Sequence, residues 1–169
     1  KCEKIIKVGY NKLNRGGGAT RNKCVRMSSY PYIFCLDSDN ILDKKSALKI
    51  IDNIRFDTDV NCFSSISFFI DIGTIDISAK RWSFPYKQMK LVHMSNDGAH
   101  PVSSGNYLFS RKAFDDINGY EEDLGAYDSN SLGYKLLLHK KNFKIISNTF
   151  YKHRLSPNSY WSREAPHNN

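Results

Sequence analysis

The chain alternates between short apolar runs and segments whose apolar residues recur at helical spacing. Residues 4–9 (KIIKVG) and 32–36 (YIFCL) predict strands, because each is a short apolar stretch between polar or turn-forming segments. Residues 19–29 and 43–54 carry apolar side chains with helical periodicity, and Asp43 is placed to cap the second helix. This β-α-β-α order predicts an α/β domain with a mostly parallel sheet between helices, in three layers.

The second half of the chain continues this alternation. Residues 73–103 are polar and aromatic without a clear period, which predicts an irregular loop over a site. We predict one domain over residues 1–155, followed by a polar C-terminal tail over 156–169 that cannot pack by itself. Further strands are expected over 60–73, 105–110 and 143–147, with helices over 111–117 and 129–141.

Composition and charge narrow the functional classes. The 169 residues are 40% hydrophobic and carry no apolar run long enough to cross a bilayer. The net charge of +8 favours anionic partners such as nucleotides, phosphates or anionic lipid, but the basic residues are scattered, which argues against a specific nucleic-acid footprint. The four cysteines form no CxxC pair, which argues against a zinc site and for a reducing, cytoplasmic location.

The apolar run YIFCL ends in two aspartates, Asp37 and Asp39, with Ser38 between them. In an open α/β sheet, ligands bind beyond the carboxyl ends of the strands. Two carboxylates there are hard oxygen ligands for Mg²⁺ or Mn²⁺, which would in turn hold a diphosphate. The alternative is a polar turn in which Asn40 or Asp43 caps the following helix.

A glycine-rich stretch, NRGGGATRN, occupies residues 14–22. Its three glycines predict a loop that allows positive φ and close backbone approach, and the next helix N-terminus could hold an anion. The stretch matches neither G-x-G-x-x-G nor a Walker A motif, so a flexible connection remains open. Arg21 and Asn22 lie in the first turn of the expected helix, where they could contact a nucleotide or solvent.

Two later segments carry further candidates. Acidic side chains crowd residues 119–128, and Asp128 or Asp123 could act as a general base toward a sugar hydroxyl. The alternative for Asp128 is that it caps the helix from residue 129. In the segment YKHRLSPNSYW, His153 could ligate a metal and Trp161 could stack on a sugar face.

In this order, NRGGGATRN, YIFCLDSDN and SGNYLFSRKAFDDINGYEEDLGAYDSNSLGYKLL resemble family 2 glycosyltransferases with the Rossmann-like GT-A fold, over roughly residues 4–155. The resemblance implies a nucleotide-sugar donor and Mn²⁺ or Mg²⁺. By position, the resemblance implies that the nucleotide-sugar donor is bound by Arg21, Asn22, Asp37, Ser38 and Asp39. It implies that Asp37 and Asp39 bind the metal, and that Ser104, Gly105 and Asn106 line the sugar and acceptor pocket.

Two departures from the family pattern affect these expectations. The family usually has Glu-Asp before the last helix, whereas this chain has Asp128-Ser129, so Asp128 would serve as the base with Asp123 as the fallback. The family also begins with a βα unit that holds the nucleotide base, and on that pattern we expect such a unit to be missing from the sequence that starts at Lys1. On that pattern the chain is an N-terminally truncated domain. The mechanism implied is a metal-assisted, inverting displacement of the diphosphate by an acceptor hydroxyl.

Two other readings remain open. A degenerate transferase domain could bind a nucleotide or glycan without turnover, which the serine at position 129 favours. A haloacid-dehalogenase-like phosphatase also places D-x-D after a strand, but it usually has Thr or Val where this chain has Ile41. For the transferase reading, the acceptor would be a glycan, lipid or protein hydroxyl. Peripheral association with the cytoplasmic membrane face is then the second option for localisation.

Overall fold

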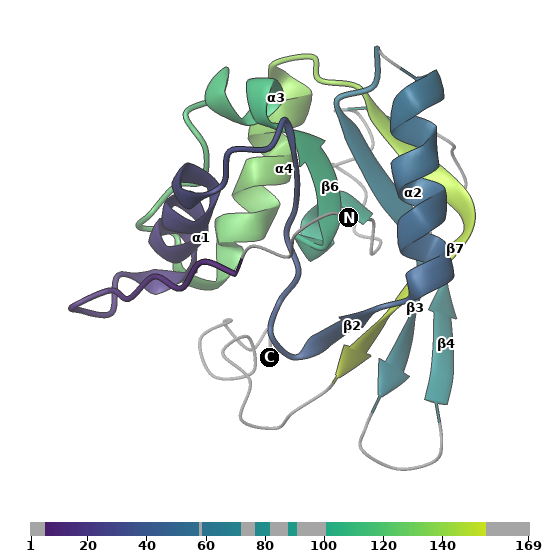
Figure 1. Ribbon diagram of the computed structural model, residues 1–169, viewed down its shortest axis with the longest axis horizontal. Helices are drawn as coiled ribbons and strands as arrows, with labels where there is room; N and C mark the ends of the chain where they lie inside the picture. Colours follow the sequence, from purple (N-terminus) through teal and green to yellow (C-terminus); the bar gives the residue numbers. More distant parts are fainter. Residues whose placement is uncertain (1–5, 58, 72–76, 82–87, 91–100, 155–169) are drawn as a thin grey trace, which may run out of the picture.

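The computed structural model describes residues 6–57, 59–71, 77–81, 88–90 and 101–154 (Figure 1). These residues form one sheet in the order β1-β6-β3-β7-β2, with β4 paired to β3 and β5 paired to β7. The strands are β1 (Tyr32–Phe34), β2 (Asn40–Leu42), β3 (Cys62–Asp71), β4 (Ile77–Arg81), β5 (Gln88–Met89), β6 (Tyr107–Ser110) and β7 (Phe143–Arg154). The helices are α1 (Gly16–Met27), α2 (Lys44–Phe56), α3 (Arg111–Asp115) and α4 (Asp128–Leu138), with 3-10 turns η2 (Pro101–Ser104) and η3 (Gly125–Tyr127).

The core lies on both faces of this sheet, as the period-two alternation of strand side chains requires. Cys62 on β3 belongs to a cluster with side chains of α1, α3 and α4, whereas its neighbour Phe63 belongs to a second cluster with Ile50 of α2. Leu108 of β6 packs in the second cluster, and the residues on either side of it pack in the first. Helix α2 therefore covers one face and the other three helices cover the opposite face (Figure 1). This confirms the predicted α/β class and its three layers.

The strand directions differ from the prediction of a mostly parallel sheet. Among the described strands only β3 and β7 run parallel, and the remaining pairs are antiparallel. The prediction assumed that each helix is a crossover between parallel neighbours. Instead, a short turn after β1 leads to β2 at the far end of the strand order. Strand β1 is half-buried and pairs with β6 alone in the described sheet.

The N-terminal segment also departs from the prediction. Residues 6–9 are exposed and form no strand, and the glycines expected in a loop form the first turn of α1. The Asn14 side-chain oxygen accepts a hydrogen bond from the Gly16 backbone N–H at 3.0 Å. A Cβ on Gly18 would lie 2.1 Å from the Glu121 carbonyl oxygen, so this helix packs directly on the backbone of a distant loop. That contact, rather than a phosphate, accounts for the buried glycine.

The other predicted helices are confirmed. The Asp43 carboxylate accepts a hydrogen bond from the Ser46 backbone N–H at 2.8 Å and so caps α2. In α4 the leucines at 132, 136 and 137 are all buried, as their helical spacing requires. No helix among the described residues is both long and apolar enough to cross a membrane. The tail predicted over 156–169 lies outside the described residues.

Candidate functional site

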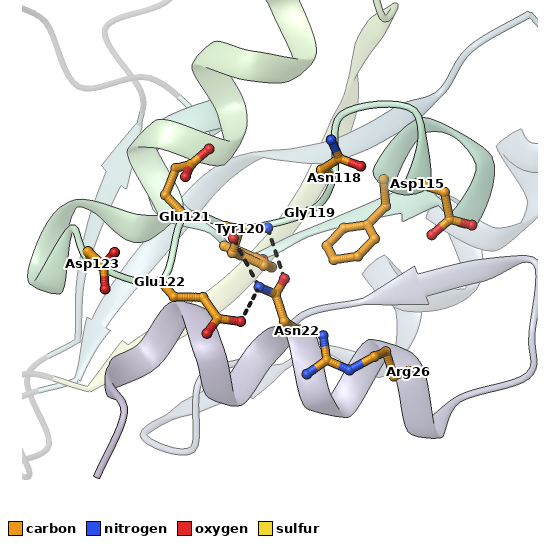
Figure 2. Close-up of a pocket in the computed structure, with 10 residues that line it drawn as sticks. Asn22, Arg26, Asp115, Asn118, Gly119, Tyr120, Glu121, Glu122 and Asp123 are labelled. Atoms are coloured by element: carbon orange, nitrogen blue, oxygen red, sulfur yellow. Dashed lines mark hydrogen bonds between the residues drawn. The ribbon is translucent and has the colours of Figure 1, made fainter.

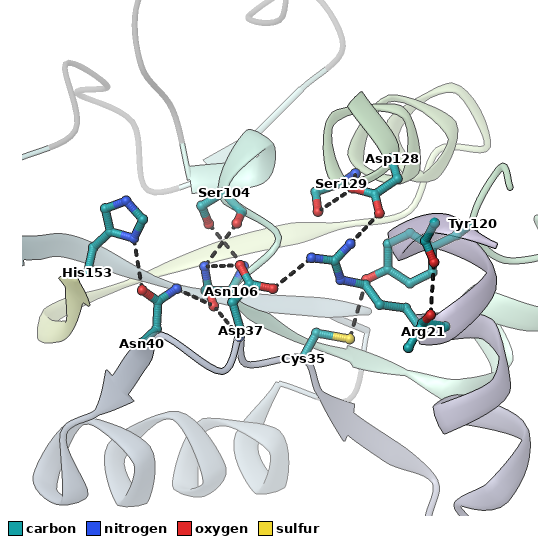
Figure 3. A network of polar contacts seen from close by, with 12 residues as sticks. Arg21, Cys35, Asp37, Asn40, Ser104, Asn106, Tyr120, Asp128, Ser129 and His153 are labelled. Atoms are coloured by element: carbon teal, nitrogen blue, oxygen red, sulfur yellow. Dashed lines mark hydrogen bonds and ion pairs between the residues drawn. The ribbon is translucent and has the colours of Figure 1, made fainter. Parts of the chain in front are cut away.

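Asp37 is held by side chains from two distant parts of the chain (Figure 3). Arg21 of α1 donates to Oδ1 of Asp37 at 2.7 Å, and the amide nitrogen of Asn106 donates to Oδ2 at 3.4 Å. The backbone N–H of Asp37 donates to Asn106 Oδ1 at 3.2 Å, and its carbonyl accepts from the Asn40 N–H at 2.9 Å. Asp37 therefore sits in a tight turn after β1 with its carboxylate already oriented.

Asn106 is buried and hydrogen-bonds to Ser104 and Asn40 as well as to Asp37. Its backbone N–H and side-chain amide donate to Ser104 Oγ at 3.2 Å and Ser104 O at 3.0 Å. Its Oδ1 also accepts from the Asn40 amide at 3.1 Å, and Asn40 Oδ1 contacts His153 Nδ1 at 2.8 Å. Gly105 has φ +71°, and a Cβ there would lie 2.5 Å from Ser129 Oγ. The predicted pocket residues 104–106 thus lie between the turn after β1 and the start of α4.

Arg21 joins the two acids expected to carry the chemistry. Its guanidinium forms one ion pair with Asp37 at 2.7 Å and another, very short, with Asp128. The same group lies 5.7 Å from the centre of the Tyr120 ring, within range of a cation–π contact. Burial by itself would lower the pKa of Arg21, but the negative charges of Asp37 and Asp128 outweigh it and raise that pKa. The guanidinium is therefore a permanent positive charge between two carboxylates.

Asp128, the predicted base, is fully engaged. One carboxylate oxygen pairs with Arg21, and the other accepts from the Ser129 backbone N–H at 2.6 Å and the Ser129 hydroxyl at 3.2 Å. Its side chain is 7% exposed. Asp128 is the first residue of α4, and Tyr127 occupies the N-cap position, so the capping alternative does not describe it.

Asp39 and Ser38 lie on the turn between Asp37 and Asn40. Ser38 is exposed and Asp39 is half-buried, and no side-chain hydrogen bond or ion pair joins Asp39 to the described residues. Over the same part of the chain, no three His, Cys, Asp or Glu side chains gather closely enough to cage a cation. One or two carboxylates still fit Mg²⁺ or Mn²⁺, because such ions commonly complete their shell with substrate phosphates and water. The side chains of Asp39 and Asp37 are therefore compatible with a cation. The His153 ring contacts Asn40, which in turn donates to Asn106.

Two predicted residues, Asn22 and Asp123, line a separate open pocket of about 630 Å³ (Figure 2). Asn22 is buried and faces this pocket's wall, where its amide donates to Tyr120 O at 2.9 Å and Glu122 Oε1 at 3.0 Å. Asp123 is exposed at the edge of the pocket. Asn22 therefore ties α1 to the acidic loop and does not join the network around Asp37. Trp161 lies outside the described residues.

Sequence reasoning missed two members of the network, Asn40 as a hub residue and Tyr151. Burial raises the pKa of Tyr151 to about 12, and hydrogen bonds to Ser104 and Asn106 act against that rise. The sequence offers Asn40 only as a helix cap, yet it is buried and donates to Asn106. Its only mark in the sequence is its place directly after Asp39.

Comparison with known proteins decides the family of this site. The sequence profile described as Glycosyl transferase family 2 matches residues 2–118, which is more than half of the chain. The chain belongs to glycosyl transferase family 2. That match includes Arg21 and the Asp37–Asp39 turn, and it ends before Asp128.

Individual relatives agree with the family. An uncharacterized glycosyltransferase of Methanocaldococcus jannaschii is 27% identical over 156 residues, covering 90% of this chain and 52% of that protein. The poly-beta-1,6-N-acetyl-D-glucosamine synthase of Staphylococcus aureus is 24% identical over 140 residues, covering 78% of this chain and 32% of that protein. The chain thus spans about half, or less, of the length of these relatives.

A solved structure shows the same fold. The crystal structure of Staphylococcus aureus TarS 1–349 in complex with UDP-GlcNAc superimposes with a TM-score of 0.71 at 16% identity. The match covers 92% of this chain and 44% of that one. At this identity the likeness establishes the GT-A glycosyltransferase fold predicted from the sequence.

Proposed function

We propose that this protein transfers a sugar from a nucleotide-sugar donor to an acceptor hydroxyl. The observation that carries the proposal is the convergence of Arg21 with Asp37 and Asp128, where Asp37 shares a turn with Asp39, in a chain of glycosyl transferase family 2. A guanidinium and a D-x-D turn at a strand end together suit a diphosphate. The TarS complexes with UDP and UDP-GlcNAc make a UDP-sugar the first donor to test, and the polysaccharide synthase makes a glycan hydroxyl the first acceptor.

In this proposal each side chain has a separate task. Arg21 pairs with the diphosphate through its planar fork of N–H donors. Asp37 and Asp39 would hold Mn²⁺ or Mg²⁺, which when bound supplies positive charge that neutralises the leaving diphosphate. Asn106 orients Asp37, to which it already donates. Residues 104–106 would line the sugar and acceptor pocket.

The displacement itself needs a proton acceptor near the attacking hydroxyl. As the acceptor oxygen forms its bond to the anomeric carbon, the bond from that carbon to the diphosphate breaks, and a carboxylate takes the hydroxyl proton. Asp128 is the proposed acceptor of that proton, with Asp123 as the fallback. A single displacement of this kind inverts the configuration at the anomeric carbon.

A binding domain without turnover is the second candidate, and a specific observation favours it. Both oxygens of Asp128 are engaged by Arg21 and Ser129, and Ser129 stands where the family pattern places a second acid. A chain arranged in this way could bind the donor and lack an available base. Turnover, rather than binding, separates the two candidates.

The test is calorimetric titration of UDP and UDP-GlcNAc, with and without Mn²⁺, on the unaltered chain, on Asp39→Asn and on Asp52→Asn. Asp52 is exposed on α2 and serves as the matched control. We expect UDP binding that requires both Mn²⁺ and Asp39 and is unchanged in the control. Absence of UDP binding by the folded protein would contradict the proposal. Sugar transfer to glycan oligomers would then identify the transferase, and binding without any sugar release would identify the binding domain.

A further inference from the structure

Arg21 connects the proposed donor site to the proposed base, and this connection has a functional consequence. We propose that Arg21 is a donor-responsive switch: in the free protein it neutralises Asp128, and the donor diphosphate takes over its guanidinium and releases Asp128. The proposal rests on the proposed function, which it deepens by assigning a positioning role to one residue. Its test is arranged so that the two can fail separately.

The exposure of the three side chains gives the switch its direction. The side chains of Arg21 and Asp37 are 24% and 35% exposed, whereas that of Asp128 is 7% exposed. An anion arriving from solvent therefore reaches the guanidinium on its Asp37 side while Asp128 stays covered. A diphosphate carries more charge than a carboxylate and presents several acceptor oxygens to the guanidinium fork. A diphosphate therefore competes strongly with Asp37 and Asp128 for the N–H groups of Arg21.

The contacts around the ion pair hold Asp128 independently of Arg21. Its other oxygen is fixed by the Ser129 N–H and hydroxyl at the start of α4. A Cβ on Gly17 would lie 2.4 Å from Asp128 Oδ2 and 2.8 Å from an Arg21 nitrogen. The ion pair therefore packs against α1 at a position where only glycine leaves room for it. The released carboxylate would therefore present Oδ2, the oxygen that Arg21 now covers, to an acceptor hydroxyl.

Thermodynamic linkage turns this geometry into a measurable coupling. If the diphosphate must displace Asp128 from Arg21, then removing the Asp128 charge removes a competitor, and diphosphates bind more tightly. Asp128→Asn keeps the shape of the side chain and weakens its hold on the guanidinium. We expect its affinity for UDP to rise by about fivefold or more, the range typical of coupled sites. A role of Asp128 in folding alone would give no such gain.

The loss of a negative charge near an anion could also tighten binding through space, and a double-mutant cycle separates the two causes. In an Arg21→Gln background there is no guanidinium for Asp128 and the diphosphate to compete for. The gain from Asp128→Asn should therefore disappear in the double variant, whereas a through-space effect would persist. Asp52→Asn on α2 measures the effect of one lost carboxylate far from the network.

The experiment titrates UDP, inorganic pyrophosphate and uridine, each with Mn²⁺, into the four members of the cycle and the control. The expected result is tighter UDP and pyrophosphate binding by Asp128→Asn, which depends on Arg21, and no effect on uridine. UDP binding that is unchanged or weaker in Asp128→Asn would overturn the switch and leave the proposed function standing. If neither the unaltered protein nor Asp128→Asn binds UDP or pyrophosphate, both proposals fail.

A second measurement covers the case in which Asp128→Asn does not fold. Arginine side-chain signals in the nitrogen-15 NMR spectrum of the unaltered protein report on the Arg21 ion pairs, and Arg21→Lys identifies the signal. The Arg21 signal should shift on adding UDP and stay in place on adding uridine. A signal that UDP leaves unmoved while other resonances respond would overturn the switch.

Discussion

Asn22 and Tyr120 exchange two hydrogen bonds across 98 residues of sequence: the Tyr120 N–H donates to Asn22 Oδ1 and the Asn22 amide donates to Tyr120 O, each at 2.9 Å. The side chain thus pairs with the loop backbone as a neighbouring strand would. A third bond from the same amide reaches Glu122 at 3.0 Å. Through this contact α1 and the acidic loop before α4 are held together, which places Arg21 between Asp37 and Asp128.

Removing this contact should destabilise the whole fold. Asn22→Ala leaves a buried N–H and C=O of Tyr120 unpaired, and we expect a loss of about 2 kcal/mol or more in the free energy of unfolding. Urea unfolding followed by circular dichroism measures it. Asn130→Ala, at an exposed position of α4, is the control and should change the midpoint little. Equal effects of the two substitutions would show that the Asn22 contact contributes nothing.

Replacing Gly18 with alanine should destabilise the fold, whereas the same substitution inside a helix usually stabilises it. Gly→Ala inside a helix normally stabilises by about 1 kcal/mol. Here the new Cβ would lie 2.1 Å from the Glu121 carbonyl oxygen and 3.1 Å from its carbon, and a backbone carbonyl cannot swing aside as a side chain can. Gly18→Ala should therefore destabilise by about 1–3 kcal/mol, the range for overpacking.

The same unfolding assay tests Gly18→Ala, with Cys24→Ala on the exposed side of α1 as its control. Because α1 carries Arg21, a shift of the helix should also weaken UDP binding. A stabilised Gly18→Ala protein would mean that α1 does not pack on the acidic loop in solution.

Local patterns predicted the parts of this structure that local interactions determine. The cap at Asp43 and the buried leucines of α4 depend on neighbours within a turn or two, and both agree with the structure. The sequence also places Asp37 and Asp39 after an apolar strand, and in the structure both lie between β1 and β2; their role in holding a metal stays a prediction. The family resemblance added the order of the motifs.

Long-range contacts decided the rest, and no local pattern encodes them. The helix α1 begins at Gly16 because its glycines pack against residues more than 100 positions later. Asn40 and Asn106 are 66 residues apart, and their shared hydrogen bond follows from the sheet order. The strand directions likewise depend on which segments meet, which periodicity alone leaves undetermined.

The cap of α2 predicts a defined response to acid. Hydrogen bonds from Ser46 lower the pKa of Asp43 below its ordinary value. A carboxyl whose pKa is lower in the folded state contributes stability above its unfolded pKa of about 3.9, and that contribution is lost as the pH falls toward the folded value. Asp43→Ala should cost about 1 kcal/mol at neutral pH, the usual value of an N-cap.

Asp43→Asn separates the cap from its charge. Asparagine caps helices about as well as aspartate but does not titrate in this range. Its stability at neutral pH should therefore be close to that of the unaltered protein, and the part of the acid destabilisation due to Asp43 should vanish. Urea midpoints between pH 3 and pH 7 give both values. An identical acid response in the asparagine variant would assign the destabilisation to other carboxyls.

The alkaline response depends on buried tyrosines and thiols, and Tyr107 gives the sharpest test. Burial raises the pKa of Tyr107 well above its ordinary value, and its hydroxyl has no hydrogen-bond partner in the structure as described. Because the folded state keeps a proton that the unfolded chain releases near pH 10, stability falls as the pH rises above about 10. Burial also raises the pKa of Cys62, which adds a loss that begins at about pH 8.5.

Tyr107→Phe removes a buried hydroxyl that gains no hydrogen bond, so it should raise the free energy of unfolding by about 1 kcal/mol at pH 7. It should also reduce the fall in stability above about pH 10. Tyr120→Phe is the contrasting variant, because the Tyr120 hydroxyl donates to Cys35 Sγ at 3.3 Å and its loss should destabilise. Urea midpoints at neutral and alkaline pH compare the two. If Tyr107→Phe destabilises at pH 7, the Tyr107 hydroxyl has a partner such as a buried water, and the alkaline prediction for it fails too.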